Sequence, residues 1–213
     1  MHEIIKEVEK LENVTHIIGL GDYFGYSAGH NEIIDLCAEK NVILIRGNHE
    51  EMCREIDCGK DNGRFFPEQY FTHKWLLENL KKEYYEYILN LPLVFRLKLN
   101  SKYSIVAFHA AHNDMESWTC GADRTTAVLE ETYAGLEENI VIYGHYHEHH
   151  VIPMGGKLLI NCAAVGMRKE NALSNYTIIE YDDEKIVVIQ KQVPYDKNEE
   201  DELVIQRGMV RRP

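Results

Sequence analysis

The sequence has no long apolar run, no excess of basic residues and no regular cysteine pattern, and each absence excludes a class of protein. No run approaches the roughly 18 apolar residues of a membrane-spanning helix. The acidic, amphipathic start MHEIIKEVEKLE is unlike a secretory signal peptide. The five cysteines are odd in number and irregular in spacing, which predicts reduced thiols in a cytoplasmic protein.

The charge balance is acidic, with 35 acidic against 23 basic residues and a formal net charge of −12. We therefore expect neither a nucleic acid nor an anionic membrane as the main partner. A phosphate substrate stays compatible with this charge, because bound cations can reverse the local potential. The length of 213 residues and the content of 45% hydrophobic and 27% charged residues predict a single globular domain over residues 1–213.

Apolar runs and helical spacings alternate along the first part of the chain. They predict a helix over 1–11, a strand over 15–20, a helix over 31–40 and a strand over 42–45. This order predicts parallel pairing of the two strands.

Farther along, residues 51–62 are polar and contain glycine, which predicts a loop with a helical turn. Aromatic and apolar residues at helical spacing predict one or two helices over 67–90. Alternation around Asn100-Ser101-Lys102 predicts an antiparallel hairpin. The remaining expectations are a helix over 123–133, strands over 140–143, 158–161, 175–181 and 186–193, and a charged, partly mobile tail over 194–213.

Four of the predicted strands end in residues that can bind metal ions. These are Asp22, Asn48 with His49, His109, and His145 with His147. In an open α/β sheet, ligands bind outside the carboxyl ends of the strands, so we expect these residues along one edge. A mixed oxygen and nitrogen set suits manganese, iron or zinc. One carboxylate among neutral ligands can bridge two ions, and two ions about 3.5–4 Å apart can stabilise an in-line displacement at phosphorus.

The motifs GDYFGY, RGNHE, AFHAAH and GHYH, in this order, resemble those of the calcineurin-like metallophosphoesterases. The later NCAAVG and the closing segment resemble the small bacterial and archaeal branch of phosphodiesterases and diadenosine-polyphosphate hydrolases. The resemblance implies an α/β protein built as a four-layer α/β/β/α sandwich with a dinuclear metal centre.

The resemblance also implies a role for each matching residue. Asp22 would bridge the two ions, Asn48, His109 and His145 would complete the second ion's ligands, and His147 would bind the first ion. Manganese is the expected metal, with iron, zinc, nickel and cobalt as alternatives.

The catalytic roles implied by the resemblance fall on a few further residues. His49, next to the ligand Asn48, would be the general acid, and the nucleophile would be a metal-bound hydroxide. Asn161 and Arg168 would contact the substrate phosphate. The other histidines are expected to be structural or solvated: His2, His16, His30, His73, His112, His149 and His150.

The chain departs from the family at its start, because the family opens with a strand ending in Asp-x-His and no such motif is found here. The helix predicted over 1–11 resembles the one that follows this motif. We therefore expect an N-terminally incomplete sequence that lacks the first strand, since its neighbours would otherwise expose or bury unpaired backbone groups. The alternative is a protein that binds one metal or none.

The expected function is that of a metal-dependent phosphoesterase acting on a phosphodiester or a nucleotide phosphoanhydride. The substrate would be a small phosphorylated molecule, with nucleotides among the candidates, and a homo-oligomer is left open. Two alternatives remain at this point: a non-catalytic or regulatory protein that binds metal or phosphate with an incomplete first site, and a protein phosphatase.

Overall fold

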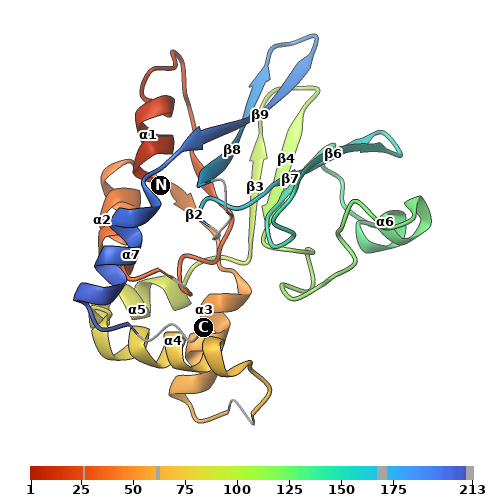
Figure 1. Ribbon diagram of the computed structural model, residues 1–213. Helices are drawn as coiled ribbons and strands as arrows, with labels where there is room; N and C mark the ends of the chain where they lie inside the picture. Colours follow the sequence, from red (N-terminus) through yellow and green to blue (C-terminus); the bar gives the residue numbers. More distant parts are fainter. Residues whose placement is uncertain (26, 61–62, 167–171, 210–213) are drawn as a thin grey trace. The chain divides into compact units, whose positions relative to one another are not determined.

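The computed structural model describes residues 1–25, 27–60, 63–166 and 172–209, which form a mixed α/β fold (Figure 1). The predicted α/β class is confirmed. The chain divides into two compact units, which are described separately below. Unit 1 comprises Met1–Val14 and Leu93–Tyr195, and unit 2 comprises Thr15–Pro92 and Asp196–Pro213. A single domain over residues 1–213 and the four-layer arrangement stay predictions.

Unit 1 is built on a mixed five-stranded sheet. Its strands, in their order across the sheet, are β3 (Val94–Lys98), β4 (Ser104–Phe108), β5 (Ile140–Tyr143), β7 (Lys157–Cys162) and β6 (His149–Met154). The central strands β4, β5 and β7 are parallel, and β3 and β6 pair antiparallel at the two edges. The predicted β3–β4 hairpin is confirmed. Strand β6 was not predicted; it contains Pro153, which has no N–H to donate and is tolerated on an edge strand.

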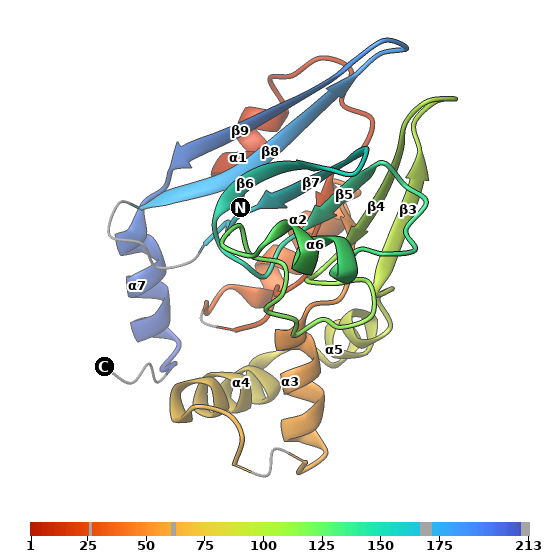
Figure 2. The same ribbon diagram turned by 90° about the vertical axis from the view of Figure 1, so that its right-hand side faces the viewer.

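One hydrophobic cluster of unit 1 lies on the face of this sheet that α6 (Thr126–Thr132) covers (Figure 2). Leu129 of α6 and the following Tyr133 pack with Phe108 of β4 and Tyr143 of β5. The rings of Phe108 and Tyr133 stack with centroids 5.9 Å apart. Every residue of β5 is buried, as expected for a central parallel strand that is covered on both faces.

A long hairpin completes unit 1. Its strands are β8 (Leu173–Tyr181) and β9 (Ile186–Pro194), and α1 (His2–Val8) contacts both of them. The turn between the strands is held by Asp182, whose Oδ1 accepts the backbone N–H groups of Glu184 and Lys185.

Unit 2 contains a two-stranded parallel sheet and five helices within its described residues. Its elements are β1 (Ile18–Gly19), α2 (His30–Glu39), β2 (Ile43–Leu44), α3 (Asn48–Asp57), α4 (Pro67–Asn79), α5 (Lys82–Leu89) and α7 (Lys197–Gln206). The predicted parallel pairing of β1 with β2 is confirmed. Helix α3 contacts both α4 and α5, as both views show (Figures 1 and 2). Among the residues that the structure describes, no helix is both long and apolar enough to cross a lipid bilayer.

One prediction for unit 2 was wrong, and another left out a helix. Much of the segment predicted as a loop over 51–62 belongs to α3, which buries Met52 and Cys53. The charged tail, for which no helix was predicted, contains α7, whose N-cap Asp196 accepts the backbone N–H of Asn198. Both helices expose mostly charged residues and bury only a few apolar ones, so the sequence shows no clear apolar spacing typical of a helix there.

We expect Leu159→Ala in β7 to lower the free energy of unfolding by about 2–5 kcal/mol, because the side chain is wholly buried and its loss leaves a cavity. Urea unfolding of the whole chain measures this change. The control Val187→Ala, at a position 37% exposed on β9, should cost about 0.5 kcal/mol or less. Equal losses for the two variants would contradict the assignment of the core.

Candidate functional site

In unit 2, the first predicted metal ligand lies on a left-handed turn directly after β1. Gly21 has a φ of 93° and Asp22 a φ of 59°. Aspartate tolerates this region better than most side chains do, yet a non-glycine residue there still carries strain of about 1–3 kcal/mol. Such strain persists where the surrounding structure fixes the backbone, so the contacts around Asp22 explain its conformation.

The buried carboxylate of Glu50 supplies these contacts. Glu50 Oε2 accepts the backbone N–H groups of Asp22 and Gly47, each at 2.8 Å, and Oε1 accepts that of Phe24 at 2.9 Å. Burial, together with the nearby Asp22 carboxylate, raises the pKa of Glu50, while the three N–H donors favour its charged form. Glu50 thereby joins the turn after β1 to the first turn of α3.

The next two predicted site residues open α3. Asn48 is its first residue and is buried, and the backbone N–H of His49 donates to Asp22 Oδ1 at 3.0 Å. A carboxylate at a helix N-terminus is favoured by the helix dipole. Gly25 has a φ of 134°, and a Cβ added there would lie 3.0 Å from His49 Nδ1, so the close approach of the loop to this ring needs glycine. Unit 2 therefore brings Asp22 and His49 together.

In unit 1, the parallel register places two predicted ligands at one edge of the sheet. Phe108, the last residue of β4, pairs with Tyr143, the last residue of β5. Beyond the strands, the Gly144 N–H donates to the His109 carbonyl at 2.8 Å. His145 follows with a φ of 58°, a second left-handed residue at a predicted ligand position.

The rings of His109 and His145 meet at this edge. His109 Nε2 lies 3.2 Å from His145 Nδ1, and both side chains are buried. Two imidazole nitrogens bound to one ion at about 2.0–2.1 Å lie about 3 Å apart when they are neighbouring ligands. The pair therefore fits a divalent ion of this kind, although a direct hydrogen bond would have the same length.

The other predicted site residues differ in their placement. Asn161 is wholly buried at the end of β7, where its Nδ2 donates to the Gly144 carbonyl at 2.5 Å and its Oδ1 accepts the Ala163 N–H at 2.9 Å. These bonds hold the turn before His145, and contact with substrate stays a prediction. His147 is half-buried after that turn. Arg168 lies outside the described residues.

The sequence reasoning did not single out two residues beside the predicted ligands. A sequence pattern could have identified Glu50, because a glutamate three residues after a helix N-cap commonly accepts the cap N–H. No sequence pattern pointed to Trp118. The centroid of its ring lies 4.6 Å from that of the His145 ring, and Trp118 is 61% exposed. Its position depends on the path of the loop between β4 and α6.

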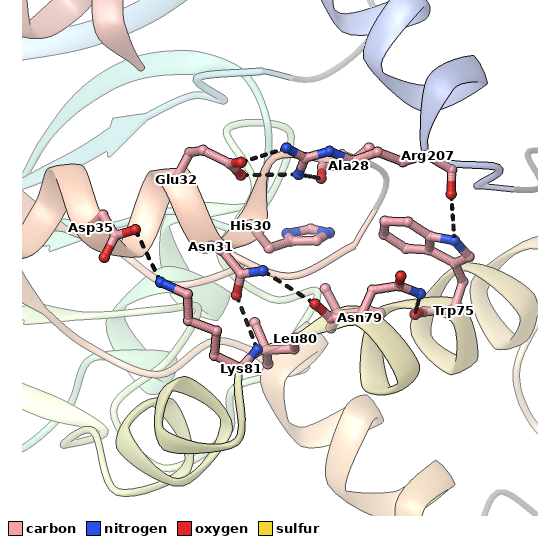
Figure 3. Close-up of a pocket in the computed structure, with 11 residues that line it drawn as sticks. Ala28, His30, Asn31, Glu32, Asp35, Trp75, Asn79, Leu80, Lys81 and Arg207 are labelled. Atoms are coloured by element: carbon pink, nitrogen blue, oxygen red, sulfur yellow. Dashed lines mark hydrogen bonds and ion pairs between the residues drawn. The ribbon is translucent and has the colours of Figure 1, made fainter.

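Unit 2 also has a hollow of about 370 Å³ that none of the predicted ligands lines (Figure 3). Trp75, Lys81 and Arg207 surround it, and His30 lies at its centre in the view. The ion pair of Arg207 with Glu32 occupies its rim. Burial lowers the pKa of His30 to about 4, although His30 Nδ1 lies 3.0 Å from the Tyr23 carbonyl.

This pKa predicts an acid-sensitive stability. Between pH 6.5 and about 4 the unfolded His30 takes up a proton that the folded one does not, so the free energy of unfolding falls as the pH falls. The loss is up to about 1.4 kcal/mol per pH unit. His30→Gln should flatten the curve in this range in urea unfolding, and the exposed control His16→Gln should not. If the free energy of unfolding of His30→Gln depended on pH as steeply as that of the wild type, the lowered pKa of His30 would be contradicted.

We expect Glu50→Gln to lower the free energy of unfolding by about 2–4 kcal/mol, because an amide NH₂ would face backbone donors that lose their acceptor. Chemical unfolding measures the change. The neighbouring Glu51→Gln is the matched control, since Glu51 bonds to Arg54 in the next turn of α3 and should cost about 0.5 kcal/mol or less. A loss for Glu50→Gln no larger than that for Glu51→Gln would show that the carboxylate does not hold the turn.

Comparison with known proteins places these residues in a family. The uncharacterized protein MJ0912 of Methanocaldococcus jannaschii is 25% identical over 205 residues, which cover 88% of this chain and 79% of that protein. The crystal structure of the hypothetical protein PH1004 from Pyrococcus horikoshii OT3 has a similar fold, with a TM-score of 0.82 at 17% identity over 98% of this chain and 88% of that one. The model of the calcineurin-like phosphoesterase superfamily domain matches residues 1–184. The chain therefore belongs to the calcineurin-like phosphoesterase superfamily.

Proposed function

We propose that the protein is a metal-dependent phosphoesterase that hydrolyses a phosphodiester or a nucleotide phosphoanhydride. Membership of a phosphoesterase family supports the reaction class. The observation that carries the proposal is the buried pair His109 and His145, whose ring nitrogens lie 3.2 Å apart at the carboxyl edge of the sheet in unit 1. The substrate is a small phosphorylated molecule, with nucleotides among the candidates, and the protein acts in the cytoplasm.

The proposed ligands are those that the family motifs imply. Asp22, Asn48, His109, His145 and His147 would hold two divalent ions, with Asp22 as the bridge. This set of oxygens and neutral nitrogens suits manganese, with iron, zinc, nickel and cobalt as alternatives. The left-handed backbone of Asp22 and of His145 supports their assignment, because strained residues gather at functional sites.

The bound ions would supply positive charge at the phosphoryl oxygens and lower the pKa of water beside phosphorus. The protein's own residues would orient the metal ligands and protonate the leaving oxygen. His49, fixed at the N-terminus of α3 by its N–H bond to Asp22, would protonate the leaving oxygen as the general acid. Asn161 holds the turn that carries His145, and contacts of Asn161 and Arg168 with substrate phosphate complete the proposal.

The test replaces two of the proposed ligands, Asp22 and His145, with asparagine. Asn tolerates the left-handed region, so Asp22→Asn and His145→Asn should keep the backbone and lose the metal. We expect lower bound manganese in equilibrium dialysis, and hydrolysis of an aryl phosphodiester reduced about 100-fold or more. The matched control His16→Asn changes an exposed histidine before β1 and should keep both metal and activity.

Three results would contradict the proposal. Full metal content and full activity in Asp22→Asn and His145→Asn would remove these residues from the site. Bound metal without hydrolysis of a phosphodiester, a dinucleoside polyphosphate or a phosphopeptide would favour a regulatory binding protein. Turnover of the phosphopeptide alone would favour a protein phosphatase.

A further inference from the structure

A second histidine lies against the proposed general acid within unit 2. His73, on α4, places its Nε2 3.0 Å from Nδ1 of His49. The ring centroids are 4.9 Å apart and the ring planes 31° apart. Stacked rings would bring the centroids closer than this for the same nitrogen separation, so the two histidines meet edge to edge through one hydrogen bond.

The direction of this hydrogen bond follows from the other nitrogen of His73. His73 Nδ1 lies 2.6 Å from the backbone carbonyl of Gln69, one helical turn earlier. A carbonyl oxygen only accepts, so Nδ1 of His73 carries the hydrogen. In a neutral imidazole the second nitrogen then carries the lone pair, so His73 Nε2 accepts and His49 Nδ1 donates.

Burial keeps His73 in this neutral form. Its side chain has no exposed surface, and burial, followed by the proximity of His49, lowers the pKa of His73 to about 4. The helix that carries His73 is fixed on either side of it, since Thr72 and Leu76 are also buried.

We propose that His73 is a positioning residue, which holds His49 with Nδ1 protonated so that Nε2 is the nitrogen that gains and loses the catalytic proton. The bond from His49 Nδ1–H to His73 stays in place in both protonation states, and only Nε2 changes. Fixing the tautomer of a histidine through its second nitrogen is a general way to orient a histidine that does chemistry. The catalytic role of this tautomer rests on the proposed function, whereas the assignment of the tautomer itself does not.

The tautomer is measured directly by NMR on the full chain labelled with ¹⁵N-histidine, with His49→Asn identifying the His49 signals. We expect neutral His49 to carry its hydrogen on Nδ1, and a coupling across the hydrogen bond between His49 Nδ1 and His73 Nε2. This measurement needs no variant of His73 and no enzymatic activity.

Variants then connect the tautomer to catalysis. His73→Phe keeps a ring but removes the acceptor, so His49 should become a mixture of tautomers and kcat for an aryl phosphodiester should fall about tenfold or more. Its KM and manganese content should change less than about twofold. His73→Gln places a carbonyl oxygen near the position of Nε2 and should restore the tautomer and most of kcat. Leu76→Ala, a buried change on the same helix, controls for loosening of α4 and should leave the tautomer unchanged.

The results separate the two proposals. A wild-type His49 with its hydrogen on Nε2 would overturn the role of His73, whatever the activity. So would a wild-type tautomer in His73→Phe, or a kcat there equal to that of the wild type. If no variant and no wild-type preparation hydrolyses any phosphoester, the proposed function fails, while the NMR result still decides the tautomer.

Discussion

The buried carboxylate of Glu50 is the constraint on which the predicted catalytic residues of unit 2 depend. It accepts three backbone N–H groups from two separate segments, the loop after β1 and the glycine before α3. One side chain thereby fixes the left-handed turn of Asp22 and the start of the helix that presents His49. The side chain that holds this strained backbone is therefore one outside the predicted set of metal ligands.

In unit 1, the register of the parallel strands positions the predicted ligands. The parallel pairing of β4 with β5 and of β5 with β7 brings Phe108, Tyr143 and Asn161 level at the carboxyl edge. The Asn161 amide then bonds to the Gly144 carbonyl, and the Gln190 amide donates to the Asn161 carbonyl at 2.9 Å. A chain of hydrogen bonds thus runs from the β8–β9 hairpin to the turn that carries His145. Both units place a predicted ligand on a left-handed residue that buried amides or carboxylates support.

The sequence was sufficient for features that depend on local pattern. Apolar runs predicted the pairing of β1 with β2 and the β3–β4 hairpin, and the residues after the strands predicted that His109 and His145 share an edge. The sequence was insufficient where few residues contribute to the apolar pattern of an element. Helices α3 and α7 are mostly charged, and strand β6 contains a proline. The contact of His73 with His49 could not be predicted, because it joins α4 to α3 across 24 residues and depends on tertiary packing. The roles of Arg168 and His147 stay predictions.

The central claim is the proposal that the strand-end histidines of unit 1, His109 and His145, bind divalent metal. Crystals grown with manganese and measured for anomalous scattering test it most directly. The account predicts an anomalous peak about 2.0–2.3 Å from His109 Nε2 and His145 Nδ1. A map with no peak beside these histidines, or with manganese only at surface carboxylates, would contradict it.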